Sequence, residues 1–329
     1  MMKISKNLIW VVLLIFFTSY DCEAQELNSN ILFSKEKKYV VQGNTLSEFD
    51  KKGKFNTLLE FKDNVFKVII NQNELWMATD KGIQIYDLNN LKYVRTEFLN
   101  DKIADLTVDI EGKIWVATFF KGVYRQTDDH GFEKKLNVTT NYCITSTSNG
   151  NVYIGTNLGM YEFSIKTSNI IRYAEEAHSG HGLPDNIVEA LYADEYSNIW
   201  VIMPDNIAFK KSDNYLGEIP TFSYVGNKEN KIYKILGIQK QSYLFITQQG
   251  ILLLPSSSLK EHSHNDEIFS GHDTNAFKLS NKFLNAPENL SQETVLYAEK
   301  NGKYLYFYTL NGVWRITEKQ LINKLDKKA

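Results

Sequence analysis

A short phrase recurs along this chain of 329 residues, and it restricts the fold more than any other feature. It consists of an apolar stretch with an aromatic residue, a threonine and then a glycine three or four residues later. The clearest copies are Leu75-Trp76-Met77-Ala78-Thr79 with Gly82, Ile114-Trp115-Val116-Ala117-Thr118 with Gly122, and Val152-Tyr153-Ile154-Gly155-Thr156 with Gly159. Repeated units take the same local structure, so the phrase predicts an array of similar small sheets.

Alignment on the tryptophan position gives seven units, separated by 37, 39, 38, 47, 44 and 62 residues. The residues at this position are Tyr39, Trp76, Trp115, Tyr153, Trp200, Leu244 and Tyr306. A unit of four short antiparallel strands with this period is typical of a propeller blade. Blades stacked around an axis bury both faces of each sheet, which a lone sheet cannot do. We therefore predict an all-β propeller of seven four-stranded blades.

The second unit shows how the four strands are assigned. Residues 65–70 form an apolar run and precede a reversal at 71–73, so they are predicted to be the inner strand. The tryptophan strand follows, and then strands at 83–87 and 93–98. Other units have glycine dipeptides at the first reversal, where a tight hairpin needs residues that tolerate positive φ; these are Glu111-Gly112, Asn149-Gly150 and Asn301-Gly302. We expect residues 30–34 to pair with the last unit and close the ring.

These phrases resemble the two-component regulator propeller repeat. The fifth unit carries the resemblance best, with Gly182-Leu183-Pro184-Asp185-Asn186-Ile187-Val188, then Asp194, then Asn198-Ile199-Trp200. It departs from the repeat at Ile202-Met203, where Gly-Thr is the pattern, and at Asn206-Ile207, where Gly-Leu is the pattern. In that family such repeats commonly form the exported sensory portion of histidine kinases. No kinase segment accompanies the repeats here, so the resemblance implies an extracytoplasmic propeller that senses a ligand or docks a protein.

The first residues predict an export signal. Lys3 and Lys6 precede the apolar run from Leu8 to Phe17, and Cys22-Glu23-Ala24 resembles a cleavage site. The run is shorter than the roughly 17–25 residues that span a bilayer. We therefore predict a signal peptide at 1–24, a single propeller domain at 25–329, no membrane span in the mature chain, and a bacterial periplasmic, cell-surface or secreted location. An uncleaved anchor and lipidation at Cys22 are the alternatives.

Charge and cysteine content exclude some function classes. The formal net charge is −2, and it stays −2 after removal of residues 1–24, which contain two lysines and two acidic residues. Nucleic-acid binding needs a basic stripe, so we predict no nucleic-acid partner. Cys143 is the only cysteine after residue 24, and we expect it in the core, without a disulfide.

Candidate ligand-binding residues come from the turns after the tryptophan strands and from the connections between units. In a propeller these segments meet on one face, where aromatic planes and a few polar groups can bind a sugar or a peptide. The candidates are Lys81, Phe119, Phe120, Lys121, Asn157, His181, Asp205, Asn206 and Gln248.

Two histidine-containing segments are candidates for metal binding or catalysis. His178 and His181 lie three residues apart between the fourth and fifth units. Residues 261–273 contain His262, His264 and His272 with four carboxylates. Neither spacing matches an established site, so we interpret both as polar loops. A third segment, Asp128-Asp129-His130-Gly131, is predicted to be a hairpin turn. We predict no catalytic residue, no metal site and no cofactor.

Three functions remain open on this sequence. The first is a non-catalytic propeller that binds an envelope protein or a glycan, in a sensory or scaffold role. The second is a propeller lyase or hydrolase similar to the streptogramin lyases, which would use His181 with a carboxylate from another blade. The third is a structural part of an envelope or secretion machine. Fold alone does not decide among them.

Overall fold

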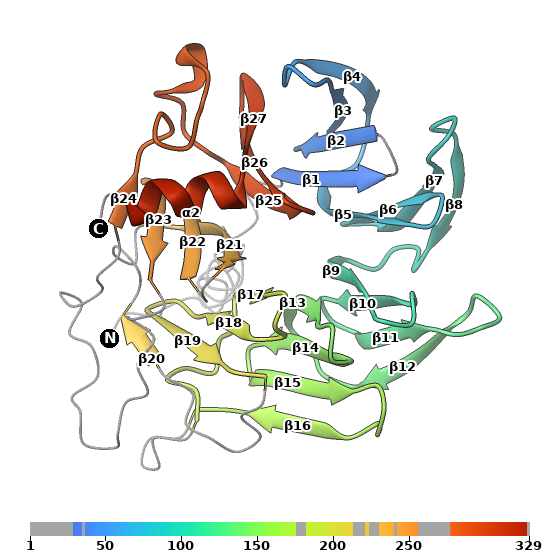
Figure 1. The fold of residues 1–329 in the computed structure, drawn as a ribbon. Coiled ribbons are helices and arrows are strands. Elements are labelled where there is room, and N and C mark those ends of the chain that lie inside the picture. The colour runs from blue at the N-terminus through green and yellow to red at the C-terminus, as the bar shows by residue number, and fades with distance from the viewer. Residues whose placement is uncertain are drawn as a thin grey trace, which may run out of the picture.

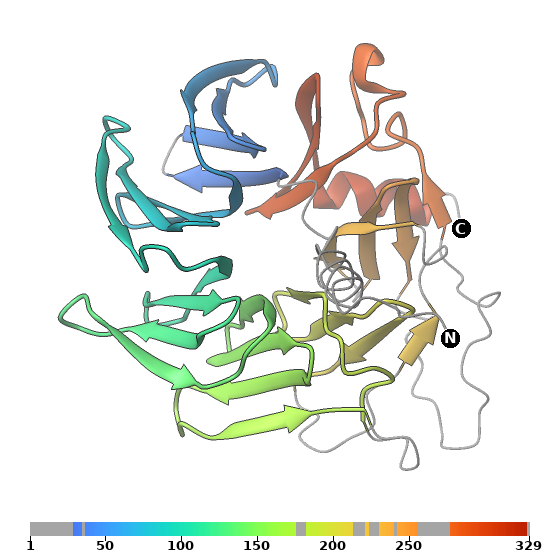
Figure 2. The same cartoon turned by 180° about the vertical axis from the view of Figure 1, so that it is seen from behind.

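The protein is a seven-bladed β-propeller (Figure 1). The computed structural model describes residues 29–34, 37–175, 182–212, 221–223, 230–239, 242–255 and 277–327. Its strands form seven antiparallel sheets around one axis, and the ring is equally clear from behind (Figure 2). This architecture confirms the fold predicted from the repeat.

The first three blades are contiguous four-stranded meanders. Blade 1 contains β1 (Ser29–Ser34), β2 (Lys37–Gln42), β3 (Thr45–Phe49) and β4 (Phe55–Glu60). Blade 2 contains β5 (Val65–Asn71), β6 (Glu74–Thr79), β7 (Gly82–Asp87) and β8 (Tyr93–Glu97). Blade 3 contains β9 (Ile103–Val108), β10 (Ile114–Thr118), β11 (Gly122–Gln126) and β12 (Phe132–Leu136).

The remaining blades repeat this order, except that blade 7 has three strands among the described residues. Blade 4 contains β13 (Asn141–Ser146), β14 (Asn151–Thr156), β15 (Gly159–Ser164) and β16 (Ile170–Tyr173). Blade 5 contains β17 (Ala190–Ala193), β18 (Ile199–Ile202), β19 (Asn206–Lys210) and β20 (Thr221–Ser223). Blade 6 contains β21 (Ile232–Ile238), β22 (Ser242–Thr247), β23 (Gly250–Leu254) and β24 (Phe277–Leu279). Blade 7 contains β25 (Tyr297–Asn301), β26 (Tyr304–Thr309) and β27 (Gly312–Thr317).

The tryptophan position lies on the second strand of every blade, as the alignment predicted. All seven residues at this position are buried: Tyr39, Trp76, Trp115, Tyr153, Trp200, Leu244 and Tyr306. Their side chains pack between neighbouring sheets. Trp76 of blade 2, for example, shares a core cluster with Ile103 and Leu106 of blade 3. The large side chain therefore fills the space between blades, and this burial drives the stacking.

The repeated threonine and glycine form the turn after the second strand. In five blades the threonine hydroxyl donates to the carbonyl oxygen of the glycine at 2.7–3.1 Å; the pairs are Thr79–Gly82, Thr118–Gly122, Thr156–Gly159, Thr247–Gly250 and Thr309–Gly312. At the preceding turn, Gly112, Gly150 and Gly302 take positive φ values of 75°, 91° and 55°. The repeated threonine and glycine therefore stabilise the turn between the second and third strands in these five blades.

Ring closure differs from the sequence expectation. Residues 30–34 were predicted to pair with the last unit, but they belong to β1, which pairs with β2 of blade 1 from Ser29↔Gln42 to Ser34↔Lys37. Only two residues separate Ser34 from Lys37, and such a short connection favours a hairpin. Among the described residues, blades 1 and 7 are instead joined by a side-chain cluster that includes Ile31, Phe49, Tyr306 and Val313, and by a hydrogen bond from Val313 N to the carbonyl oxygen of Gly53.

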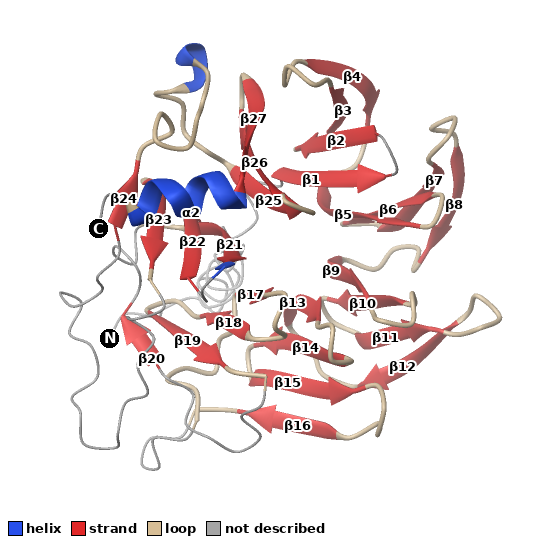
Figure 3. Cartoon of the chain, viewed as in Figure 1, coloured by secondary structure: helices blue, strands red, loops and turns tan. Residues whose placement is uncertain are grey.

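A helix follows the last blade (Figure 3). This helix, α2 (Glu318–Asp326), begins with a capping box in which Thr317 and Gln320 satisfy each other's backbone N–H groups. Leu321 packs into the core cluster of blades 6 and 7, and Lys324 donates to the carbonyl oxygen of Phe283 at 2.7 Å. A short 3-10 helix (Glu288–Leu290) lies in the connection between β24 and β25. The helix thus fixes the end of the chain onto the propeller.

Several expectations concern residues that lie outside the described ranges. They are the signal peptide at 1–24 with Cys22, the loop with His178 and His181, and the cluster with His262, His264 and His272. Within the described part of the chain, no helix has the length and apolar character that crossing a bilayer requires. The turn predicted at 128–131 is confirmed as the reversal between β11 and β12, where His130 has a φ of 64°.

Candidate binding face

One face of the ring is formed by the turns between the second and third strands together with the connections between blades. We call it the turn face. Backbone hydrogen bonds join these segments into one continuous surface over blades 2 to 5. The bonds run from Asn100 N to Lys81 O (3.0 Å), Phe119 N to Lys102 O (2.8 Å), Thr140 N to Phe119 O (2.8 Å), Asn157 N to Thr140 O (3.2 Å) and Gly159 N to Asn186 O (2.7 Å).

Eight of the nine candidate residues from the sequence lie on this face. They are Lys81 after β6, Phe119, Phe120 and Lys121 after β10, Asn157 after β14, Asp205 in the turn before β19, Asn206 at the first position of β19, and Gln248 after β22. Gln248 N donates to Lys231 O at 2.9 Å, so the turn of blade 6 also lies against the connection that precedes its blade. The ninth candidate, His181, is outside the described residues.

The two candidate lysines are held by local ion pairs. Lys81 Nζ contacts Asp63, and Lys121 Nζ contacts Asp101, each in the connection that precedes the lysine's own blade. The hydrogen bond from Lys81 to Asp63 raises the pKa of that lysine, and Asp101 does the same for Lys121. Both ammonium groups are largely exposed, so these pairs contribute little stability. Because of these ion pairs, the two lysines are less available to bind a charged ligand than the sequence suggested.

Exposed apolar side chains form an arc across this face. Among the described residues, Leu99, Phe120, Leu158 and Ile187 have exposed fractions of 68%, 62%, 44% and 39%. All four lie on the hydrogen-bonded segments of blades 2 to 5 described above. We call these four residues the apolar arc. Single exposed apolar residues are common on protein surfaces, whereas several on one face are typical of an interaction site.

Aromatic rings surround the middle of the arc. The ring of Phe119 lies 4.6 Å from that of Phe120 and 5.9 Å from that of Tyr142, with both pairs in edge contact. Lys102 Nζ lies 4.7 Å from the centre of the Phe119 ring and 5.8 Å from that of Phe66. Edge contacts and the cation hold Phe119 in place. Phe120 is therefore presented to solvent on a rigid support.

Two acceptor atoms on this face have no hydrogen-bond partner among the described residues. They are Asp80 Oδ1 and Asn157 Oδ1, and both atoms are buried. A buried acceptor without a donor costs stability, because it has lost its water and gained nothing in exchange.

A second feature, which the sequence analysis missed, is a polar ring around the axis. In each blade the residue two positions after the tryptophan position pairs across the sheet with one residue of the innermost strand. These seven residues are Asn30, Lys67, Asp105, Cys143, Ala190, Lys234 and Tyr297, and we call them the polar ring. The shared register places them at one level of the propeller.

The polar ring connects neighbouring blades. Lys67 Nζ lies 3.8 Å from Asp105 Oδ1, and Asp105 Oδ2 accepts from the backbone N–H of Ile144 at 3.0 Å. On the other side of the ring, Lys234 Nζ donates to Tyr297 OH at 3.1 Å and pairs with Glu299 at 3.0 Å. The nearby Asp105 raises the pKa of Lys67, so this lysine keeps its charge. Because these charges are paired, we interpret the polar ring as a set of contacts that stabilises the packing of neighbouring blades.

Cys143 is buried in the core, as predicted, and its thiol donates to the carbonyl oxygen of Val188 at 3.7 Å. Burial raises the pKa of this thiol, and the negative charge of Asp105 raises it further. We therefore expect a Cys22→Ala variant, in which Cys143 is the only thiol, to be unreactive toward a disulfide reagent at pH 8 while folded. One thiol should react once urea unfolds the chain. Rapid reaction of the folded protein would contradict this burial.

The described residues contain no group of three or more His, Cys, Asp and Glu side chains that could hold a metal ion. The catalytic alternative from the sequence depends on His181, whose surroundings are not described. What the described geometry offers is a surface with exposed apolar side chains, among them Phe120, whose ring packs against that of Phe119.

No family model matches the sequence, and no curated relative matches it. Solved structures of the same fold do. Virginiamycin B lyase from Staphylococcus aureus is 15% identical with a TM-score of 0.60, and the match covers 90% of this chain and 96% of that chain. The extracellular domain of a putative hybrid two-component system from B. thetaiotaomicron is 15% identical with a TM-score of 0.59, over 89% of this chain and 40% of that chain.

PorZ, a bacterial surface component of the type-IX secretion system of Porphyromonas gingivalis, is 10% identical with a TM-score of 0.60. That match covers 88% of this chain and 46% of PorZ. At these identities the likeness shows the fold alone. The chain is thus a seven-bladed β-propeller similar in structure to an enzyme, to an extracellular sensor domain and to a surface component of a secretion system.

Proposed function

We propose that this protein is an exported, non-catalytic propeller that docks a protein of the bacterial envelope on its turn face. The single observation that carries the proposal is the apolar arc of Leu99, Phe120, Leu158 and Ile187, four exposed side chains on one hydrogen-bonded surface of blades 2 to 5. Apolar surface of this kind gains free energy when a partner covers it.

The composition of the arc favours a protein over a glycan. Three of its four members are aliphatic. The nearby Lys81 and Lys121 form ion pairs with Asp63 and Asp101. Glycan sites rely on aromatic planes with many free hydrogen-bonding groups, whereas protein interfaces have an apolar centre and a polar rim. The turn face has the composition of a protein interface, with Phe120 as its central anchor.

We propose the bacterial envelope as the location of this protein. It is supported by the signal-like residues 1–24 and by the resemblance of the repeats to the two-component regulator propeller. The structural similarity to an extracellular sensor domain and to PorZ agrees with it. A sensory role and a scaffold role both require a docking surface, so the proposal covers both.

The proposal is tested by measuring capture of the partner with matched variants. Phe120→Ala removes the exposed ring of the turn face. The control, Ile110→Ala, removes a side chain of the same blade that is 57% exposed. Ile110 lies in the turn between β9 and β10, on the opposite face of the ring. The tagged full-length chain would be expressed in its source organism and the captured protein identified. Loss of a central aromatic anchor typically costs about 2 kcal/mol, so we expect Phe120→Ala to weaken binding about thirtyfold.

Ile110→Ala should bind as the unsubstituted chain does. Both variants should keep the unfolding midpoint, because exposed substitutions change stability by only about 0.5 kcal/mol. Equal binding by the two variants would argue against the turn face as the docking surface. Recovery of a glycan whose binding depends on Phe120 would keep the face and replace the protein partner.

A further inference from the structure

Among the residues that the structure describes, blade 7 lacks the fourth strand that every other blade has, which leaves one edge of its sheet without a strand partner. Its sheet has the order β25-β26-β27, so β27 is the outermost strand of the described residues. At one point blade 1 covers this edge, because Val313 N donates to the carbonyl oxygen of Gly53 in the turn between β3 and β4 at 3.2 Å. The N–H of Val313 therefore points away from β26. Backbone groups of alternate residues point the same way, so the N–H and C=O of Arg315 also face the open edge.

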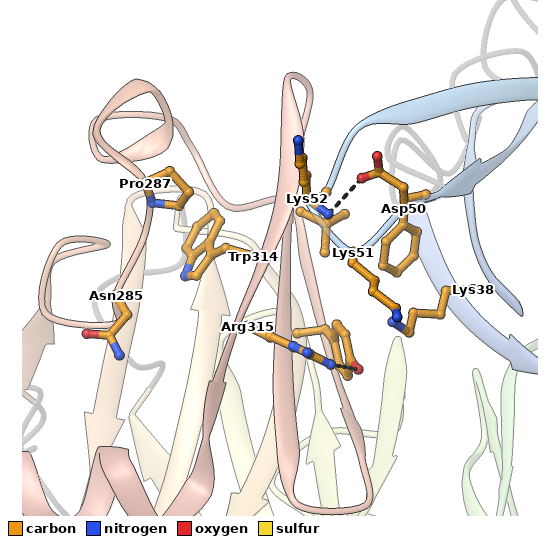
Figure 4. Close-up of a pocket in the computed structure, with 12 residues that line it drawn as sticks. Lys38, Asp50, Lys51, Lys52, Asn285, Pro287, Trp314 and Arg315 are labelled. Atoms are coloured by element: carbon orange, nitrogen blue, oxygen red, sulfur yellow. Dashed lines mark hydrogen bonds between the residues drawn. The ribbon is translucent and has the colours of Figure 1, made fainter. Parts of the chain in front are cut away.

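A pocket of about 290 Å³ surrounds this edge. Figure 4 shows Asn285, Pro287 and Trp314 on one side of the strand, and Arg315, Lys38 and Asp50 on the other. The full lining adds Phe49, Lys51, Lys52, Gly53, Tyr306 and Val313. The pocket thus occupies the place beside β27 where the fourth strand lies in the other six blades.

The pocket concentrates unpaired positive charge. Lys38, Lys51, Lys52 and Arg315 line it, and none of them forms an ion pair within the described part of the chain. The single carboxylate of the lining, Asp50, accepts hydrogen bonds from the backbone N–H groups of Lys52 and Lys54. Many other lysines and arginines of the protein are paired with carboxylates. Four cations against one anion make this pocket a site for negative charge.

The central cation is held in place before any ligand arrives. The guanidinium of Arg315 lies 4.2 Å from the centre of the Tyr304 ring, and its Nη1 donates to Tyr306 OH at 3.2 Å. Lys38 Nζ lies 5.6 Å from the centre of the Tyr306 ring. Stacking on an aromatic face leaves the other guanidinium N–H groups free to donate to a carboxylate. An oriented arginine loses less entropy on binding than a free one.

We propose that this pocket binds an extended acidic segment of a partner protein, which lies along the edge of β27. A backbone residue of the segment would exchange hydrogen bonds with the N–H and C=O of Arg315, and its acidic side chains would meet the four cations. Such strand addition takes affinity from the main chain and specificity from the side-chain pockets. The positive charge of the pocket favours an acidic segment over a neutral one. The site is separate from the turn face and does not depend on the function proposed for it.

The test uses a labelled pentapeptide of alternating glutamate and valine, with anisotropy as the readout and the full chain as receptor. The same peptide with lysine in place of glutamate controls for charge. Arg315→Gln removes the guanidinium, and Lys166→Gln makes the same charge change in the exposed turn between β15 and β16. A charge-assisted hydrogen bond supports an effect of about tenfold. We expect Arg315→Gln to weaken binding of the glutamate peptide at least tenfold and Lys166→Gln to leave it unchanged.

Two further probes separate strand addition from simple anion binding. The glutamate peptide N-methylated at its central residue cannot donate to the strand edge, and glutarate supplies two carboxylates without a backbone. We expect both to bind at least tenfold more weakly than the parent peptide. Glutarate or the methylated peptide binding as tightly as the parent would overturn strand addition. Equal binding by the two protein variants, or equal binding of the lysine peptide, would overturn the site.

Discussion

Trp115→Ala is expected to lower the free energy of unfolding by about 3–5 kcal/mol, the usual cost of removing a fully buried indole. Trp115 has no exposed surface and lies between blades 3 and 4, with its ring 5.1 Å from that of Phe163. Its Nε1 also donates to Asp109 Oδ2 at 2.8 Å. The substitution therefore opens a cavity between two blades and removes a donor from a buried carboxylate.

Urea unfolding followed by circular dichroism measures this loss. Trp115→Phe keeps most of the ring but lacks the N–H, so it should lie between the alanine variant and the unsubstituted protein. Tyr196→Ala, at an exposed site in the turn before β18, should change stability by no more than about 0.5 kcal/mol. A loss of less than about 1 kcal/mol for Trp115→Ala would contradict the view that the tryptophan position holds the blades together.

Lys210→Met is the second substitution with a large expected effect. Lys210 on β19 and Glu162 on β15 form an ion pair between blades 5 and 4, with Nζ and Oε2 3.4 Å apart and side-chain exposures of 3% and 8%. Glu162 also accepts from Asn151 Nδ2 at 2.6 Å and from Tyr173 OH at 2.8 Å. Removal of the lysine leaves a buried carboxylate without its counter-charge. Breaking such a pair typically costs about 3–5 kcal/mol.

A double-mutant cycle with Glu162→Gln measures the interaction itself. The double variant has no buried charge at this site, and its amide can keep a hydrogen bond with Tyr173. We expect it to be more stable than Lys210→Met alone, because the charge that lacked a partner is gone. Stability losses that simply add would show that the two residues do not interact.

The repeat predicted the fold because its period reports blade geometry directly. Each residue of the tryptophan position, from Tyr39 to Tyr306, lies on a second strand, and Gly112 and Gly150 adopt the positive φ that their turns require. Both signals are local: one buried residue for each sheet, and one turn for each hairpin. A local pattern repeated seven times therefore determined the number of blades.

Ring closure and the polar ring could not be predicted in the same way. Residues 30–34 were expected to pair with the last unit, but they pair with β2, and the two-residue connection to Lys37 that favours this hairpin is a weak sequence signal. Lys67, Asp105 and Lys234 each appear as one charge within an apolar run. Their alignment depends on register shifts near each of them, which occur at Val65/Lys67, Ala117/Thr118 and Ile232/Lys234. A single sequence does not show such shifts.

The candidate face was partly predictable. The turns were identified from spacing, so eight candidate residues lie on the turn face as the propeller geometry requires. The ion pairs of Lys81 and Lys121 were not foreseen, since Asp63 and Asp101 come from connections without a sequence motif. Leu99 and Ile187 were missed for a related reason, because exposure of an apolar residue in a connection depends on how the neighbouring turns pack.

The central claim is that a protein partner covers the turn face, and site-specific photocrosslinking in the source organism tests it most directly. A photoreactive phenylalanine analogue would replace Phe120 in one chain and Ile110 in another, two exposed positions of blade 3 on opposite faces. We predict one crosslinked protein from position 120 and none from position 110. Crosslinks to the same protein from both positions, or from position 110 alone, would contradict the claim.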